Sequence, residues 1–122
     1  MSTPTTSTPV DPSRLQELRD LFGDEEEIRL LFIDFFSELP GRLETLETAL
    51  GHNAREGVER AAHALSGSAG SLGAMASHKA AKELEEAARS GQEGLEELAA
   101  RLRAELDRLR SWAVQEGLLP QE

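Results

Sequence analysis

A seam of apolar residues with helical spacing runs through the middle of this chain and directs it towards a helical fold. Its members follow one another at steps of four and three, which gives a period of about 3.5 residues. We find no segment with the alternating apolar and polar pattern of a half-buried strand. The seam consists of Ile28, Phe32, Phe35, Leu39, Leu43, Leu46 and Leu50.

The composition also favours an all-α protein. Ala, Leu, Glu and Arg predominate, Tyr is absent, and β-branched residues are few outside the Thr-rich N-terminal segment. At 122 residues the chain has the size of one domain and can bury a core without disulfides. It contains no Cys, which excludes disulfides, thiolate metal sites and cysteine nucleophiles.

Charge and hydropathy exclude several classes of partner. Thirteen Lys and Arg against 23 Asp and Glu give a net charge of -10, which repels nucleic-acid backbones and anionic membranes. The longest apolar run, Leu30–Ile33, is far too short to span a bilayer. The N-terminus lacks the basic and apolar regions of a secretory signal. We therefore expect a cytoplasmic protein that binds neither nucleic acid nor membrane.

Changes in composition predict the domain boundaries. Residues 1–11 are mostly Ser, Thr and Pro, and we expect them to form a disordered tail. Residues 12–117 should form one helical domain, followed by a short C-terminal tail at residues 118–122. A short helix is expected to begin at Pro12 and to end at Gly23.

The apolar seam should form a long second helix. Asp24–Glu27 supply a capping residue and acidic side chains for the positive end of its dipole. Pro40 lies within the seam and predicts a kink or a break near Glu38 or Leu39. Gly51–Asn53 then provides a turn.

Three more helices are expected over residues 54–72, 74–90 and 92–117, separated by Gly73 and by Ser90–Gly91. Short connections between long amphipathic helices favour antiparallel neighbours. We therefore predict an antiparallel up-down four-helix bundle with a short extra helix at its N-terminus. The inner stripe of the first of these three helices comprises Val58, Ala62, Leu65, Ala69 and Leu72.

One of the three histidines, His63, occupies an outer helix face. It falls about 140° around the helix from the inner stripe, so its ring should point to solvent. Gly67 shares this face, and Gly70 lies at about 120°. A mid-helix Gly costs about 0.5–1 kcal/mol relative to Ala. Either a partner backbone approaches the imidazole here, or the glycines permit tight helix packing, which suits Gly70. We expect His52 and His78 to be ordinary surface histidines.

These positions resemble the H-x-L-K-G-S-[AS] motif of histidine-containing phosphotransfer (Hpt) domains. The matching residues are HALSGSA at 63–69 and LGA at 72–74, and the resemblance extends from residue 13 to about residue 116. Hpt domains are four-helix bundles that pass phosphoryl groups between Asp residues of receiver domains. The resemblance implies that His63 is the phosphoacceptor, through Nε2.

The chain departs from the family pattern at one position of this motif. The family usually has Lys three residues after the phosphoacceptor, where this chain has Ser66. The resemblance implies that this Lys stands beside the phosphoryl group as a point charge. Lys79, Lys82 and Arg89, on the next expected helix, are candidates for a replacement charge.

A second family position is Glu85, twenty-two residues beyond His63. The family often has Gln or Glu there, with its side chain hydrogen-bonded to the imidazole. A carboxylate that accepts from Nδ1–H leaves Nε2 unprotonated and nucleophilic. The alternative is an exposed Glu85 that pairs along its own helix with Lys82 and Arg89.

Two apolar residues, Leu30 and Ile33, fall on the outer side of the seam. Either the short N-terminal helix covers them, or they belong to a docking surface near His63.

Together these features predict a phosphorelay intermediate without kinase activity of its own. His63 would accept a phosphoryl group from a receiver phosphoaspartate and pass it to the Asp of another receiver. The receiver would hold the Mg²⁺ needed for transfer, so we expect no cofactor or metal in this chain. Expected partners are response-regulator receiver domains and a hybrid sensor kinase of a bacterial phosphorelay, and we expect a stand-alone monomer. Two alternatives stay open: a helical adaptor in which His63 is incidental, and a pseudo-Hpt domain that binds a receiver without accepting phosphate.

Overall fold

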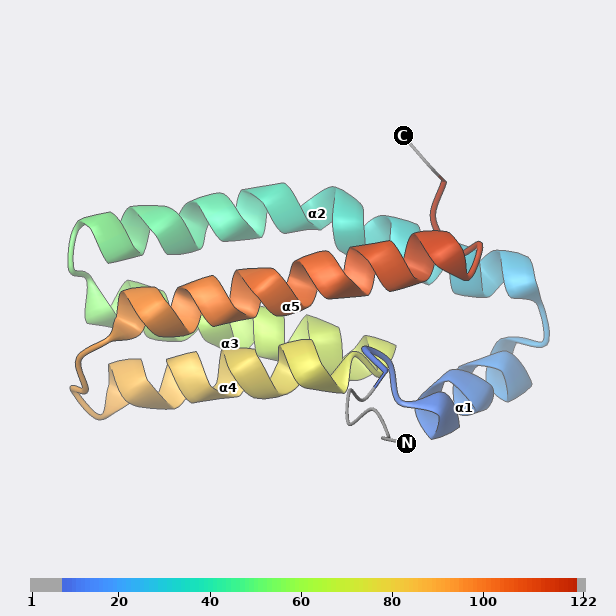
Figure 1. Ribbon diagram of the computed structural model, residues 1–122, viewed down its shortest axis with the longest axis horizontal. Coiled ribbons are helices and arrows are strands. Elements are labelled where there is room, and N and C mark those ends of the chain that lie inside the picture. Colours follow the sequence, from blue (N-terminus) through green and yellow to red (C-terminus); the bar gives the residue numbers. More distant parts are fainter. Residues whose placement is uncertain (1–7, 121–122) are drawn as a thin grey trace, which may run out of the picture.

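The computed structural model describes residues 8–120, and these contain five helices and no strand (Figure 1). The all-α prediction is confirmed, and the helices begin and end within a few residues of the expected positions. The helices are α1 (Pro12–Phe22), α2 (Glu25–Gly51), α3 (Arg55–Leu72), α4 (Met75–Arg89) and α5 (Leu95–Gln115).

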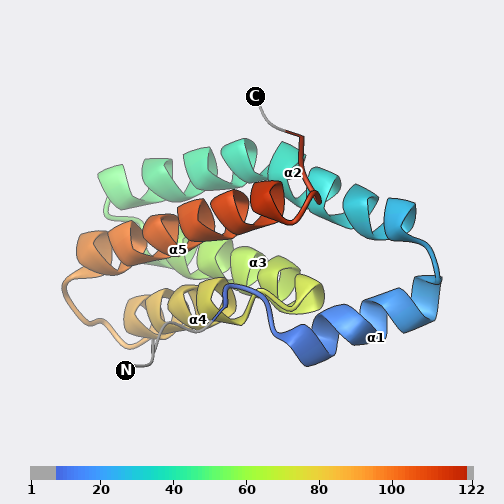
Figure 2. The same ribbon diagram turned by 45° about the vertical axis from the view of Figure 1, so that its right-hand side comes forward.

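The four long helices lie alongside one another around a shared apolar core. α3 packs against both α2 and α4, and α5 packs against α4 and α2. α1 contacts α2 and lies at the end of the molecule where α3 turns into α4 (Figures 1 and 2). None of the described helices has the length and hydropathy needed to cross a membrane. Side chains from every long helix are fully buried in the core, among them Phe32, Leu46, Leu65, Leu84 and Leu102.

Local sequence signals determine where the helices start and stop. The Asp24 side chain accepts a hydrogen bond from the backbone N–H of Glu26 and caps α2. Gly23 and Gly73 adopt φ values of 66° and 81° and end α1 and α3, as predicted. A Cβ at Gly73 would lie 2.6 Å from Cγ of Arg14, so this turn also needs glycine for space.

Pro40 does not interrupt α2. The helix continues from Glu25 to Gly51 with Pro40 inside it, so of the kink or break predicted near Glu38 or Leu39, the break is wrong. Pro40 lacks the N–H that would donate a hydrogen bond to the carbonyl of Phe36, and this loss destabilises an isolated helix. Buried side chains on both sides of Pro40 hold the helix together, because Phe36, Leu39 and Leu46 all belong to the core.

Both flanks of the expected domain carry core residues. Val10, within the tail expected at 1–11, is 1% exposed. Leu118 and Leu119, within the tail expected at 118–122, are also buried. Burial of these side chains in the core stabilises the folded state, which composition alone does not indicate. The other parts of the two tails, residues 1–7 and 121–122, lie outside the described residues.

Candidate functional site

The candidate site lies where α3 and α4 pack against each other in an antiparallel register. A step along α3 corresponds to an equal step along α4 in the opposite direction. This register brings residues that are distant in the sequence together in pairs. The pairs are Glu59 with Arg89, His63 with Glu85, and Gly70 with His78.

His63 is exposed, as its position on the helix predicts. Its side chain is 73% exposed, whereas the inner stripe of α3, from Val58 to Leu72, is buried. The ring is nevertheless held in one orientation, because Nδ1 lies 3.0 Å from Oε2 of Glu85. α3 therefore presents the imidazole at the surface, and α4 fixes one of its two nitrogens.

Glu85 is a buried carboxylate. Its side chain is 4% exposed, and Oε2 accepts a hydrogen bond of 2.8 Å from Nη2 of Arg89 in addition to the contact with His63. The exposed alternative for Glu85 is therefore wrong, although its expected pairing with Arg89 is present. The other oxygen, Oε1, is buried without a hydrogen-bond partner among the described residues. Burial of a carboxylate is costly unless it is paired, so Arg89 and His63 help to keep Glu85 in place.

The contact between His63 and Glu85 determines which nitrogen of the ring is nucleophilic. An ionised carboxylate can only accept, so Nδ1 of His63 must be the donor. In a neutral imidazole, the other nitrogen then carries the lone pair. The lone pair of Nε2 is thus available on an exposed ring.

Arg89 bridges two carboxylates. Its Nε donates to Oε2 of Glu59 at 2.9 Å, while Nη2 donates to Glu85. The hydrogen bond to Glu59 and the charge of Glu59 raise the pKa of Arg89 above its ordinary value, with smaller contributions from Glu85 and Glu86. Glu59 is not among the residues predicted from the sequence; the signal that indicates it is its position one turn before His63 on α3.

The two glycines of α3 have different environments. A Cβ at Gly67 would meet nothing within 4 Å, so the surface one turn beyond His63 is open. A Cβ at Gly70 would lie 3.1 Å from Nδ1 of His78. That nitrogen bonds the carbonyl oxygen of Ser66 at 2.9 Å. Gly70 therefore permits tight packing of α3 against α4, which is the interpretation that the sequence favoured for this glycine.

One expectation near this contact needs correction, and one residue of the motif lies in a covered position. His78 is half-buried against α3 and is not an ordinary surface histidine, because Gly70 leaves room for its ring. Ser66 is 4% exposed, so the position where the family has Lys is covered in this chain. His52 is exposed at the end of α2, as expected.

The three candidate replacement cations lie in different places. Arg89 belongs to the hydrogen-bonded group around His63. Lys82 is exposed on α4 and makes no ion pair in the described part of the chain. Lys79 lines a hollow of about 600 Å³ together with Glu83 and with Arg101 of α5, so it faces away from His63.

A groove between α2 and α3 runs beside the site. One part, of about 320 Å³, is lined by Arg42, Arg60, Ala64 and neighbouring small residues. A second part, of about 240 Å³, also borders Arg42 and continues past Ser68 towards the start of α2. On that helix Leu30 and Ile33 are 43% and 38% exposed. α1 therefore leaves both residues accessible.

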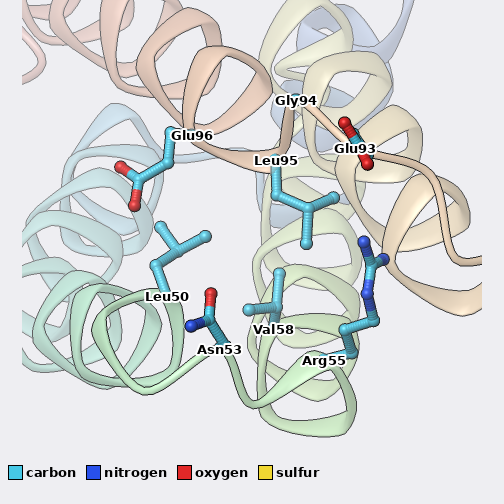
Figure 3. Close-up of a pocket in the computed structure, with 8 residues that line it drawn as sticks. All are labelled: Leu50, Asn53, Arg55, Val58, Glu93, Gly94, Leu95 and Glu96. Carbon is cyan, nitrogen blue, oxygen red and sulfur yellow. The ribbon is translucent and has the colours of Figure 1, made fainter.

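Another hollow, of about 270 Å³, lies at the opposite end of the bundle of helices. Figure 3 shows Leu50, Val58 and Leu95 pointing into it from α2, α3 and α5. Arg55 at its edge donates hydrogen bonds to the backbone carbonyls of Ala87 and Ala88 at the end of α4 and of Gln92 in the connection to α5. The lining residues include no Ser, Thr, Cys or His.

The chemistry that this arrangement offers is narrow. It provides one accessible imidazole nucleophile and one carboxylate that orients it. Within residues 8–120, no three His, Cys, Asp or Glu residues are grouped so that they could hold a metal ion. Such a site can accept a group onto nitrogen and release it again.

Comparison with known proteins identifies the family. The family model of the Hpt domain matches residues 30–112, which include His63 and Glu85. Neither the search of curated proteins nor the search of solved structures found a match. The family match extends from the start of α2 into the last turns of α5 and so covers well over half of the chain. The chain therefore belongs to the Hpt domain family, the histidine phosphotransfer modules that work with receiver domains in phosphorelays.

Proposed function

We propose that this chain is a phosphorelay intermediate that carries a phosphoryl group on His63. Nε2 attacks the phosphorus of a receiver phosphoaspartate, the N–P bond forms, and the bond from phosphorus to the aspartyl oxygen breaks. The aspartate leaves as a carboxylate. Attack by the Asp of a second receiver reverses these steps and returns the free imidazole. The observation that carries this proposal is an exposed imidazole whose Nδ1 is held by a buried carboxylate.

Glu85 acts on both states of the imidazole. Before transfer it selects the tautomer with the lone pair on Nε2. After transfer the ring keeps its proton on Nδ1 and gains positive charge, which the carboxylate stabilises. Glu85 is therefore a positioning residue, and the receiver supplies most of the catalysis.

The surroundings of His63 support the docking of a receiver. Gly67 leaves open space in which a partner backbone can approach the ring, and the groove between α2 and α3 continues that surface. Leu30 and Ile33 add exposed apolar area on α2. Lys82 supplies a cation without a partner in the described part of the chain, one turn from Glu85 on α4.

The partners in this proposal are response-regulator receivers and a hybrid sensor kinase, and the Mg²⁺ for transfer is held by the receiver. The chain works as a monomer. In this view α2–α5 form an antiparallel four-helix bundle, and α1 is a short extra helix. Contacts of α5 with both α4 and α2 support that arrangement, because they close the core on all sides.

One observation favours a second candidate function. Ser66 replaces the usual Lys of the motif and is buried, so this chain lacks a cation at that place. A pseudo-Hpt domain that binds a receiver without accepting phosphate has no need of such a cation. A helical adaptor in which His63 is incidental does not need this cation either.

Intact-mass measurement after mixing with a phosphorylated receiver tests the proposal. A carrier gains the mass of one phosphoryl group, and acid treatment removes it because the phosphoramidate bond is acid-labile. Receiver binding without a gain in mass would identify the pseudo-Hpt domain. If the chain neither binds the receiver nor gains mass, the helical adaptor is the remaining function.

A further inference from the structure

Four charged or polar side chains form a continuous chain from Glu59 to His63. Nε of Arg89 donates to Oε2 of Glu59 at 2.9 Å, and Nη2 of Arg89 donates to Oε2 of Glu85 at 2.8 Å. The same oxygen of Glu85 accepts from Nδ1 of His63 at 3.0 Å. Arg89 is thus divided between two carboxylates, while Oε2 of Glu85 is shared between two donors.

This division is not the arrangement that an isolated pair would choose. A guanidinium and a carboxylate prefer two parallel hydrogen bonds, which use both carboxylate oxygens. Glu85 has its second oxygen, Oε1, buried and without a partner in the described residues. Arg89 nevertheless makes one bond to Glu85, because its Nε is bound to Glu59.

The two donors of Glu85 compete for the same oxygen. Full engagement of Arg89 with Glu85 would add a second N–H donor at Oε1, draw negative charge from the carboxylate and so weaken the hydrogen bond that Oε2 accepts from His63. We propose that Glu59 is a positioning residue that holds Arg89 back, so that Glu85 retains an acceptor for Nδ1 of His63. This positioning role rests on the proposed function of His63 as phosphoacceptor, and it concerns the tautomer of the His63 ring.

The tautomer of His63 can be measured without any transfer reaction. Nitrogen chemical shifts of the ¹⁵N-labelled imidazole show which ring nitrogen carries the proton in the unphosphorylated chain. The native chain should show the proton mainly on Nδ1. In Glu59→Ala, the fraction with the proton on Nδ1 should fall, and phosphoryl acceptance should slow by about threefold, a barrier change of about 0.7 kcal/mol.

Two further variants separate positioning from a structural role. Glu56→Ala removes a carboxylate one turn earlier on α3 that makes no ion pair in the described residues, so it should leave tautomer and rate unchanged. Glu59→Ala combined with Arg89→Ala removes the competing guanidinium as well. This double variant should restore the proton to Nδ1, which a general loss of structure would not do.

The outcomes distinguish this inference from the proposed function. An unchanged tautomer in Glu59→Ala, or a native chain with the proton on Nε2, would overturn the positioning role of Glu59. A tautomer that responds as described, in a chain that never accepts phosphoryl, would support the positioning role and overturn the proposed function. Failure of the double variant to recover the native tautomer would assign the effect to structure and not to competition by Arg89.

Discussion

Oε2 of Glu85 lies 3.0 Å from Nδ1 of His63, although 22 residues separate them in the sequence. The carboxylate is buried and the imidazole is exposed, so the contact joins the core of the protein to its surface. Its length depends on the register between α3 and α4, and the pairs on either side of it follow the same register. The orientation of the exposed His63 ring therefore depends on a buried carboxylate between α3 and α4.

Loss of the carboxylate should slow transfer without abolishing it. In Glu85→Ala the imidazole still presents Nε2 for part of the time, so we expect a loss of about tenfold, which corresponds to about 1.4 kcal/mol of barrier. Rapid-quench measurement of phosphoryl acceptance checks this. Glu86→Ala, at the next and exposed position, should keep the native rate. Equal rates for the two variants would contradict the role given to Glu85.

A bulky residue at Gly67 should hinder the partner and spare the fold. Gly67→Gln places a side chain in open space on the exposed helix face, where better helix propensity should stabilise the protein by about 0.5–1 kcal/mol. The affinity for a receiver, measured by calorimetry, should fall because the new side chain occupies the space of the partner backbone.

Gly51→Gln is the control for that variant. Gly51 is also a helical glycine with open space around it, but it lies at the end of α2. Its substitution should leave receiver affinity unchanged. Native affinity in Gly67→Gln would show that this glycine has no part in docking.

Gly70 should respond differently from Gly67. Gly67→Ala should gain about 0.5–1 kcal/mol from helix propensity. Gly70→Ala should lose this gain, because its Cβ presses on His78 and disturbs the bond to the Ser66 carbonyl, a bond worth about 1 kcal/mol. Thermal unfolding measures both, and in a His78→Ala background Gly70→Ala should regain stability. An equal gain at both glycines in the native background would contradict the packing role of Gly70.

The exposed apolar residues of α2 should contribute to docking more than to stability. Leu30→Ser combined with Ile33→Ser should lower the free energy of unfolding by about 1 kcal/mol per site, because more than half of each side chain is covered and Ser is a weaker helix former than Leu. Receiver affinity should fall, since apolar area is lost from the interface. Leu21→Ser, at an exposed residue of α1, is the control. A loss of affinity in the control alone would place docking on α1.

Much of the fold follows from local signals in the sequence. The period of the apolar residues identifies the helices, and the glycines after α1 and α3 mark their ends. The same period places His63 outside the buried stripe of α3, and the exposed ring confirms it. These features depend on one helix at a time, which is why a single sequence reveals them.

Other features depend on how two helices meet. The position of Glu59 one turn before His63 places it near the site, but the register of α4 is what brings Arg89 beside it, and α3 alone does not indicate that partner. Ser66 is covered, and His78 is drawn against α3, because the glycine at position 70 lets the helices approach closely. Pro40 stays within α2 because core contacts on both sides outweigh its local cost. Tertiary packing overrides local preference in each case.

Substitution of His63 decides whether this residue carries the phosphoryl group. His63→Gln and His52→Gln are each mixed with a phosphorylated receiver, and the intact mass and the thermal unfolding of each variant are measured. We expect an acid-labile gain of one phosphoryl group in the native chain and in His52→Gln, and none in His63→Gln. The unfolding temperature of His63→Gln should stay close to that of the native chain because the ring is exposed. An acid-labile gain of one phosphoryl group in His63→Gln would contradict the proposal that His63 is the phosphoacceptor.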